Sequence, residues 1–389
     1  MDLVEISAGP LAAVCASITL MIAPLIVHRC SHLAIVASLA CSGTGETLID
    51  GAVDTACPDT AVDAGCDASW RREVLATGDV SYQNAIAIDP GGNIHVARYD
   101  RGTATIVYTT NASGAWTSET VATLTNPTFP APAIAINDEG HVVVAYLDRG
   151  GRDVWFIVRS APGWTREPIE TNTSGAQSLD MLVGGDGLPR VVYNRIQVGG
   201  ARVASRVSTT WSLTTVATTD SAGDVAIVDT TPGRTLVAHD RFPLSGIVVS
   251  TDASGVFTST VLASNGGAFT NLARAPNGDV FLAYEGSGQL RYAVLSAGAW
   301  TSYPDAAVID YVHDVATLAD GSFAVLYRAT AGRELRLGTV RGGQLTSESI
   351  DTVGDAGLSA AIATRGAEIH VAYRREGAQP ELVHAWTCR

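Results

Sequence analysis

The chain has 389 residues, of which 16% are charged, and its formal net charge at neutral pH is −14. An acidic chain without a basic patch lacks the electrostatic footprint that binds nucleic acid or an anionic membrane surface, so we expect neither as a partner of its folded part. Its 39 glycines and its many Val, Thr and Ala residues are typical of short strands joined by tight turns.

The first 40 residues predict export from the cell. Residues 11–27 form an apolar run that Pro24 interrupts, and a second apolar run, residues 33–40, ends at Cys41. Residues 39–43 (Leu-Ala-Cys-Ser-Gly) resemble a bacterial lipoprotein cleavage site, whose cysteine becomes the lipidated N-terminus. We therefore expect residues 1–40 to be a signal peptide or membrane anchor, and Cys41 to be lipidated.

An uncleaved anchor through residues 11–27 is the alternative, since this run is just long enough to span a bilayer. Either way we expect an outer-membrane or cell-surface lipoprotein, or a periplasmic protein, that contacts a membrane only through its N-terminal anchor. Residues 41–65 are rich in Gly, Thr, Ala and Asp and contain no basic residue, so they predict a flexible, acidic linker.

From residue 70 onward, one large residue recurs every 43 to 48 positions. A fixed period of this size indicates one supersecondary unit that is copied around or along an axis. The repeated positions are Trp70, Trp116, Trp164, Trp211, Phe257, Trp300 and Leu345. We expect these side chains to seal one unit against the next rather than to bind a ligand.

Each unit follows the same order of local patterns, as residues 133–164 illustrate. A short strand rich in Ala and Ile, residues 133–136, precedes a tight turn at residues 138–140 and a second strand at residues 143–146. A third strand alternates by two, and the fourth begins at the large residue, here Trp164. Seven such units of four antiparallel strands predict an all-β fold, a seven-bladed β-propeller.

The two ends of the repeat region are incomplete in complementary ways. Residues 70–74 are typical of a fourth strand with no blade before it, and residues 381–386 are typical of a third strand with no fourth strand after it. We therefore expect the N-terminal strand to complete the last blade, so that the propeller occupies residues 66–389. An open solenoid is the alternative, but its terminal repeats would need polar caps.

Two cysteines fall where the last blade lacks a covalent turn. When this blade is aligned on the fifth, Cys66 and Cys388 both lie at the hairpin between the third and fourth strands. A Cys66–Cys388 disulfide would replace the missing turn, and export permits it. Cys57 is the competitor, through a bond to either cysteine. The cysteine spacings do not suggest a metal site.

Three turn segments look like degenerate Asp boxes, in which Ser or Thr, Asp, Gly and an aromatic residue order the turn before the fourth strand: residues 109–116, 160–164 and 250–257. On these motifs, residues 70–389 resemble the bacterial exported propellers related to the sialidase, or Asp-box, superfamily. Sialidases need an Arg triad, a Tyr nucleophile with a Glu partner and an Asp acid. The resemblance implies the fold alone, and we assign no catalytic residue and no cofactor.

In a propeller, the loops that enter the first strands share one face with the loops that join the second and third strands. Polar residues gather in both sets, so we expect a ligand site at this mouth of the axis. The expected ligand-binding residues are Asp180, Asp224, Asn271, His313, Asp314, Arg149, Arg195 and Arg241. The arginines could hold a carboxylate or sulfate, and the aspartates a cation. The alternative is that Asp and Arg of neighbouring loops pair and tie the blades together.

The leading hypothesis is a binding or scaffold module, with a protein or a glycan as its ligand at the axial face. The alternative is a glycan-active hydrolase or lyase of sialidase-like type that uses the Arg/Asp-rich face, and a third interpretation is a purely architectural domain. An enzyme would leave a carboxylate pair and an arginine unpaired in the axial mouth, whereas a scaffold would pair them all.

Overall fold

A computed structural model describes residues 68–389, except residues 129, 161–162, 174, 217–220, 243–245, 253–255, 265 and 305. The predicted signal peptide, the lipidation site Cys41 and the linker lie outside the described residues. Within the part of the chain that is described, no helix is long and apolar enough to cross a membrane.

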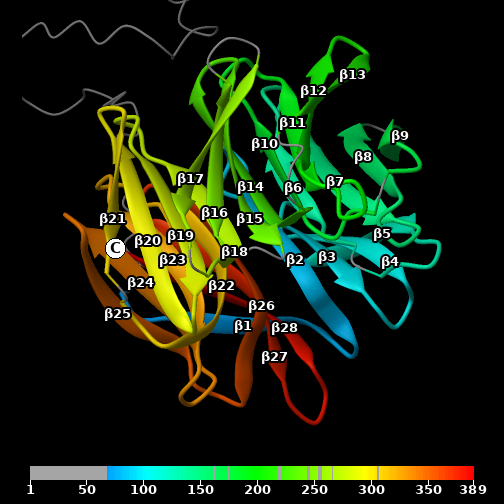
Figure 1. The fold of residues 1–389 in the computed structure, drawn as a ribbon. Helices are drawn as coiled ribbons and strands as arrows, with labels where there is room; N and C mark the ends of the chain where they lie inside the picture. Colours follow the sequence, from blue (N-terminus) through cyan, green and yellow to red (C-terminus); the bar gives the residue numbers. More distant parts are fainter. Residues whose placement is uncertain are drawn as a thin grey trace, which may run out of the picture. The chain divides into compact units, whose positions relative to one another are not determined.

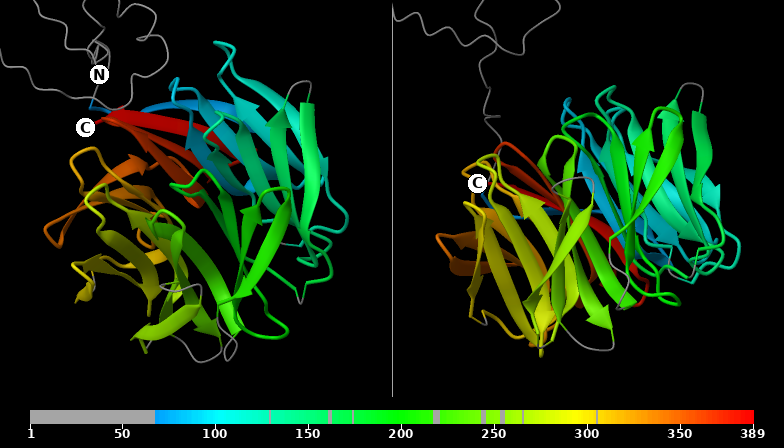
Figure 2. Two further views of the ribbon diagram at one scale, coloured as in Figure 1. Left: turned by 90° about the horizontal axis from the view of Figure 1, so that it is seen from above. Right: turned by 45° about the horizontal axis from the view of Figure 1, so that its top comes forward.

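Seven antiparallel sheets of four strands each surround one axis, as Figures 1 and 2 show. The prediction of a seven-bladed β-propeller is therefore confirmed. Six blades are continuous in sequence and are numbered here in chain order. The innermost strand of each blade contacts the innermost strands of the two neighbouring blades.

From the axis outward, the strands of the first three blades are β2 (Val80–Ile88), β3 (Ile94–Asp100), β4 (Thr105–Thr110) and β5 (Thr117–Thr123); β6 (Ala133–Ile136), β7 (Val142–Asp148), β8 (Asp153–Ser160) and β9 (Gly163–Glu170); and β10 (Leu179–Val183), β11 (Pro189–Asn194), β12 (Ala201–Val207) and β13 (Thr210–Thr215). Those of the next three are β14 (Ser221–Thr231), β15 (Arg234–Phe242), β16 (Ile247–Asp252) and β17 (Phe257–Ala263); β18 (Ala268–Arg274), β19 (Val280–Gly286), β20 (Gln289–Ser296) and β21 (Ala299–Tyr303); and β22 (Ile309–Thr317), β23 (Phe323–Ala329), β24 (Leu335–Arg341) and β25 (Gln344–Asp351).

The seventh blade joins the two ends of the described chain. From the axis outward it consists of β26 (Asp355–Arg365), β27 (Glu368–Glu376), β28 (Glu381–Cys388) and β1 (Arg71–Thr77). Antiparallel pairing places Glu73 of β1 opposite His384 of β28, and the two strands lie side by side in Figure 1. This is the closure that the incomplete end repeats predicted.

The predicted disulfide is only partly within the described residues. Cys388 ends β28 and is disulfide-bonded. Cys66 lies outside the described residues, and so does its competitor Cys57. The pairing of Cys388 with Cys66 therefore stays a prediction.

Local sequence explains why each blade folds as a four-stranded meander. All residues of the second strand β7 are buried, since this strand lies between two others and is covered by the neighbouring blades. The turn before it contains Gly140, whose φ of 77° is accessible to glycine at little cost. The outermost strand β5 is mostly exposed, which matches its polar sequence.

The seven repeated large residues each pack into a different apolar core between two blades. Trp164 contacts the core between the first and second blades, and Trp211 contacts the core between the second and third. The other five cores contain Phe257, Trp300, Leu345, Trp70 and Trp116. This packing confirms the prediction that these residues seal one blade against the next.

Candidate functional site

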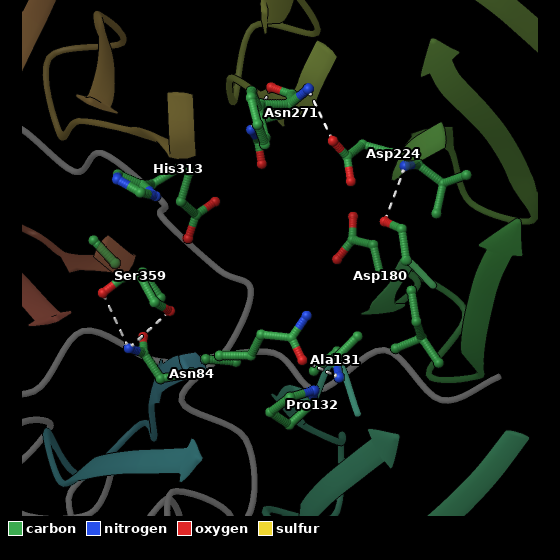
Figure 3. Close-up of a pocket in the computed structure, with 18 of the residues that line it drawn as sticks. Asn84, Ala131, Pro132, Asp180, Asp224, Asn271, His313 and Ser359 are labelled. Atoms are coloured by element: carbon green, nitrogen blue, oxygen red, sulfur yellow. Dashed lines mark hydrogen bonds between the residues drawn. The ribbon is translucent and has the colours of Figure 1, made fainter. Parts of the chain in front are cut away.

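A cavity of about 380 Å³ lies on the axis of the propeller (Figure 3). Its wall consists of residues from the beginning or the middle of the first strand of each of the seven blades, or from just before that strand. The cavity therefore belongs to the end of the axis at which the chain enters the blades, as the sequence predicted. Its volume lies within the range of small-molecule binding sites.

Five of the eight predicted ligand-binding residues line this cavity, namely Asp180, Asp224, Asn271, His313 and Asp314. In Figure 3, Asp180 and Asp224 lie together on one side, and His313 lies across the cavity from them. Residues that are far apart in sequence meet here because each first strand runs along the axis.

The other three predicted residues, Arg149, Arg195 and Arg241, do not line the cavity. Each lies at the end of a second strand, which is one strand further from the axis than the aspartates. Arg149 forms an ion pair with Asp153, with 3.3 Å between Nη1 and Oδ2. The structure thus separates the predicted arginines from the predicted aspartates, and no arginine is among the described residues of the cavity wall.

The carboxylates of Asp180 and Asp314 tie neighbouring first strands together. Asp180 in β10 accepts a hydrogen bond from the N–H of Ile227 in β14 at 2.9 Å. Asp314 in β22 accepts one from the N–H of Ile362 in β26, also at 2.9 Å. Each carboxylate accepts a second bond from the N–H of the residue that follows it. Because first strands of neighbouring blades share no sheet, these side chains satisfy backbone donors that have no partner in a ladder.

Other polar side chains of the cavity make the same kind of connection. Asp224 Oδ2 accepts a hydrogen bond from the N–H of Phe269 in the next blade at 2.9 Å. The amide of Asn84 donates to the carbonyl oxygen and to the hydroxyl of Ser359, at 3.3 and 3.2 Å. The polar wall therefore has a structural role in addition to any contact with a ligand.

Burial shifts the pKa values of the two tying carboxyl groups upward. It raises the pKa of Asp180 to about 6 and that of Asp314 to about 7. The nearby charge of Asp180 contributes to the raised pKa of Asp314, which places the two groups within electrostatic reach of each other. Backbone hydrogen bonds favour the ionised forms but do not outweigh burial. The charge of the cavity therefore changes near neutral pH.

A second carboxyl pair consists of Asp224 in the cavity wall and Asp240, which does not line the cavity. Burial raises the pKa of Asp240 to about 7, and the charge of Asp224 adds to this shift. Burial also raises the pKa of Asp224 itself. His313 shifts in the opposite direction, since burial lowers its pKa to about 4, so its ring is neutral at pH 7.

Two arginines of second strands, Arg328 and Arg374, form ion pairs that tie blades together. The side chain of Arg328, in the sixth blade, is only 5% exposed and pairs with Asp310 of its own blade and with Asp355 of the seventh. Arg374 of the seventh blade contacts Asp79, which precedes the first blade, with 3.7 Å between Nη2 and Oδ1. For these arginines the geometry agrees with the blade-tying interpretation.

Sequence reasoning missed several residues of the cavity wall, among them Gln83, Gln177, Ser178 and Thr270. The registers of β2 and β18 are irregular just before the regular pairing begins, and such bulges expose residues that a strict alternation would hide. The signal that could have found them is a polar pair near the start of the first strand, such as Thr270 and Asn271.

The donor and acceptor set of the cavity limits what it can hold. Among the described residues, no group of three or more His, Cys, Asp or Glu side chains is arranged to hold a metal ion. The carboxylates already accept backbone hydrogen bonds but retain further lone pairs, and the amides and hydroxyls can both donate and accept. The arrangement is best suited to a ligand that carries several hydroxyl groups.

Solved structures share this fold. A streptogramin B lyase is similar with a TM-score of 0.57 at 11% identity, over 82% of this chain and 98% of that one. The polysaccharide lyase Uly1 has a TM-score of 0.54 at 10% identity, over 81% and 91%. A six-bladed fungal lectin from Aleuria aurantia has a TM-score of 0.51 at 14% identity, over 71% and 98%. At these identities the likeness shows the β-propeller fold alone.

The sequence matches no protein-family profile, and no curated protein matches it. The resemblance to the sialidase, or Asp-box, superfamily therefore stays a prediction that rests on the turn segments alone.

Proposed function

We propose that the protein is an exported, lipid-anchored β-propeller that acts as a binding module and takes a glycan in its axial cavity. The observation that carries this proposal is the composition of the wall. Carboxyl, amide, hydroxyl and imidazole groups from six of the seven blades converge there, with no arginine among the described lining residues. A hydroxyl-rich ligand matches such a wall, because each hydroxyl can donate to one wall oxygen and accept from another group.

An anionic ligand fits the same wall poorly. Asp180, Asp224 and Asp314 all face the cavity without a cationic neighbour in the wall. Above about pH 7 their charges repel an acidic sugar, which disfavours a sialic acid as ligand. A neutral glycan avoids this repulsion. A protein that inserts a cationic side chain is the other ligand class of the binding hypothesis.

Two of the similar structures support a carbohydrate ligand. The Aleuria aurantia lectin is described by its fucose recognition mode, and Uly1 is described as a polysaccharide lyase. Both are propellers that act on or bind carbohydrate. Their identity to this chain is too low to transfer a particular sugar.

A glycan array tests the proposal. The full chain, purified in mild detergent, should retain a subset of neutral glycans. An Asp314→Asn variant should lose this binding at least about tenfold, because the amide cannot accept the same hydrogen bonds. The control is Asp138→Asn, which makes the same charge change in an exposed turn. If wild type binds no glycan but captures a cationic peptide, the glycan proposal fails and the protein-ligand form remains.

The alternative function is a glycan-active hydrolase or lyase. The observation that favours it is that two carboxyl groups, Asp180 and Asp314, line one cavity, where burial raises their pKa values to about 6 and about 7, a range that suits general acid–base chemistry. The hypothesis that such an enzyme uses an Arg/Asp-rich face requires arginines at the site, and none is among the described residues of the cavity wall. A panel of fluorogenic glycosides, with assays for unsaturated products, tests this alternative at pH 6. Turnover that is lost in Asp180→Asn would show that the protein is an enzyme rather than a binding module. Retention of a glycan without turnover would exclude the enzyme.

The export signals form a separate part of the proposal. Lipidation at Cys41 predicts that metabolic labelling with a fatty acid marks the wild type, and that Cys41→Ser loses both the label and membrane association.

Mass spectrometry of the nonreduced protein should recover Cys388 linked to Cys66. A Cys57–Cys66 or Cys57–Cys388 linkage would instead contradict the proposed Cys66–Cys388 bond, while β1 would still complete the seventh blade.

A further inference from the structure

One contact between blades recurs at the rim of the propeller. In four blades the outermost strand carries a glutamate at the same register position, opposite the third strand, and the next blade supplies a tryptophan. The glutamates are Glu73, Glu119, Glu167 and Glu348, and the tryptophans that follow them are Trp116, Trp164, Trp211 and Trp70. The repeat thus provides four versions of one interface.

Three of the four interfaces are closed by a hydrogen bond from the indole to the carboxylate. Trp211 Nε1 donates to Glu167 Oε1 at 2.8 Å. Trp70 Nε1 donates to Glu348 Oε1 at 3.2 Å. The third bond is from Trp116 to Glu73 and helps to lower the pKa of that carboxyl, after the larger effect of a hydrogen bond with a histidine.

The fourth interface, between the first and second blades, lacks this bond. Trp164 Nε1 is buried and has no hydrogen-bond partner among the described residues. Glu119 instead pairs with Arg159, with 3.2 Å between Oε1 and Nη2. Arg159 also donates to the hydroxyl of Tyr108 at 3.0 Å, and its guanidinium lies over the rings of Tyr108 and Trp164.

The matching interface between the second and third blades shows what makes the difference. There Phe156 stands in the register position of Tyr108, so no hydroxyl is present to bind the arginine. Arg206, the equivalent of Arg159, contacts Glu167, and Trp211 reaches the same carboxylate oxygen. The two sites have the same residue types at three of four positions, yet only one leaves its indole unpaired.

A groove of about 530 Å³ opens at the unpaired site. Its described wall consists of His95, Tyr108, Glu119, Gly140, His141, Val142, Arg159, Ser160, Gly163 and Trp164. The side chains of Arg159 and Glu119 are 43% and 45% exposed, so both can reach a ligand. The groove includes turns that follow the first and third strands, and it therefore lies toward the opposite end of the blades from the axial cavity.

We infer that this groove is a second binding site, for a neutral polyhydroxylated ring such as a pyranose. The charges of Arg159 and Glu119 cancel, which favours neither an anion nor a cation. Together the pair offers donors and an acceptor to neighbouring hydroxyls of one ring. The indole N–H of Trp164 is buried and is therefore not a donor to the ligand, but the ring as a whole is partly exposed in the groove wall and offers an apolar surface to the C–H face of a sugar.

This inference shares its ligand class with the proposed function but not its site. A ligand in the groove contacts the first and second blades alone, whereas the axial cavity draws on all seven. Variants at the two sites therefore separate the two proposals.

The test is a titration of the full chain in mild detergent with methyl pyranosides of neutral monosaccharides, at millimolar concentrations. The protein carries an isotope label at its indole nitrogens, and Trp164→Phe assigns the Trp164 signal. We expect at least one glycoside to shift this signal. Arg159→Met should weaken that binding at least about tenfold, because it removes both donors to the ring.

The matched control is Arg206→Met, which makes the same change at the closed interface and should leave binding unchanged. If no glycoside shifts the Trp164 signal, or if both arginine variants weaken binding equally, the inference is overturned. If Asp314→Asn abolishes binding and Arg159→Met leaves it unchanged, the inference is also overturned, and the axial site is supported instead. If Arg159→Met is the only variant that weakens binding, the groove is supported as a site, whether or not the axial cavity also binds a glycan.

Discussion

The axis and the rim of the propeller are held together in different ways. At the axis, side chains such as Asp180 and Asp314 accept backbone hydrogen bonds from the next blade. At the rim, large side chains such as Trp211 fill the space between blades. The difference teaches that polar groups are concentrated where the blades converge, which is where the proposed ligand would contact several blades at once. At this rim Trp164 packs into the core between its blades as Trp211 does, but it lacks the hydrogen bond to a carboxylate that Trp211 makes.

The largest effect is expected from a charge that ties blades near the axis. Arg328→Met leaves Asp310 and Asp355 without their buried partner, and breaking a buried pair typically costs 3–5 kcal/mol. We expect the free energy of unfolding, measured by urea denaturation, to fall by about 4 kcal/mol. Arg333→Met is the control, since Arg333 pairs with the same Asp355 but its side chain is 66% exposed. A similar loss of unfolding free energy in both variants would contradict the claim that the buried arginine stabilises the fold more than the exposed one does.

At the rim, the expected losses come from packing. Trp211→Ala removes an indole that contacts the core between the second and third blades and leaves Glu167 without one hydrogen bond. We expect urea denaturation to show a loss of about 3 kcal/mol, near the lower end for Trp→Ala because the side chain is only partly buried. A loss below about 1 kcal/mol would mean that the rim is not sealed by these residues.

The carboxyl groups of the axis predict that stability depends on pH near neutrality. The pKa of Asp314 in the folded protein, about 7, exceeds its ordinary value, so the folded state binds this proton more tightly. The stability that it contributes is therefore lost as the pH rises from 5 to 8. An Asp314→Asn variant should gain about 2 kcal/mol relative to wild type over that interval, as measured by urea denaturation at both pH values. Asp138→Asn, in an exposed turn, is the matched control for the change of side chain.

The smallest expected effect separates two rim sites. Trp211→Phe loses the hydrogen bond to Glu167, whereas Trp164→Phe has no such bond to lose. Both variants shorten the ring by the same amount, so their difference isolates the hydrogen bond. We expect Trp211→Phe to be the less stable of the two by about 1 kcal/mol in thermal or urea unfolding. Equal stabilities would show that the two interfaces do not differ as described.

The fold was predictable because its signals are local and repeated. The spacing of the residues from Trp70 to Leu345 and the turns such as the one at Gly140 recur in each unit, so errors in one unit do not obscure the period. The closure by β1 was also predictable, since the two incomplete ends match in register.

The site was predictable only in part. The aspartates of the axis were found because the entry to each first strand is recognisable in sequence. The arginines were placed with them because the loops that join the second and third strands share one face with the loops that enter the first strands, but sequence does not show that the second strand sets Arg149 back from the axis. The groove at Trp164 was out of reach, since it depends on whether one indole reaches one carboxylate, and Glu119 and Glu167 look alike in the repeat.

The most direct test of the account is a crystal structure of the full chain with the neutral glycan that the array retains best. The account predicts electron density for a sugar ring in the axial cavity, with hydroxyl groups in contact with Asp180 or Asp314. An axial cavity without sugar, in a complex whose glycan lies on another surface, would contradict the central claim.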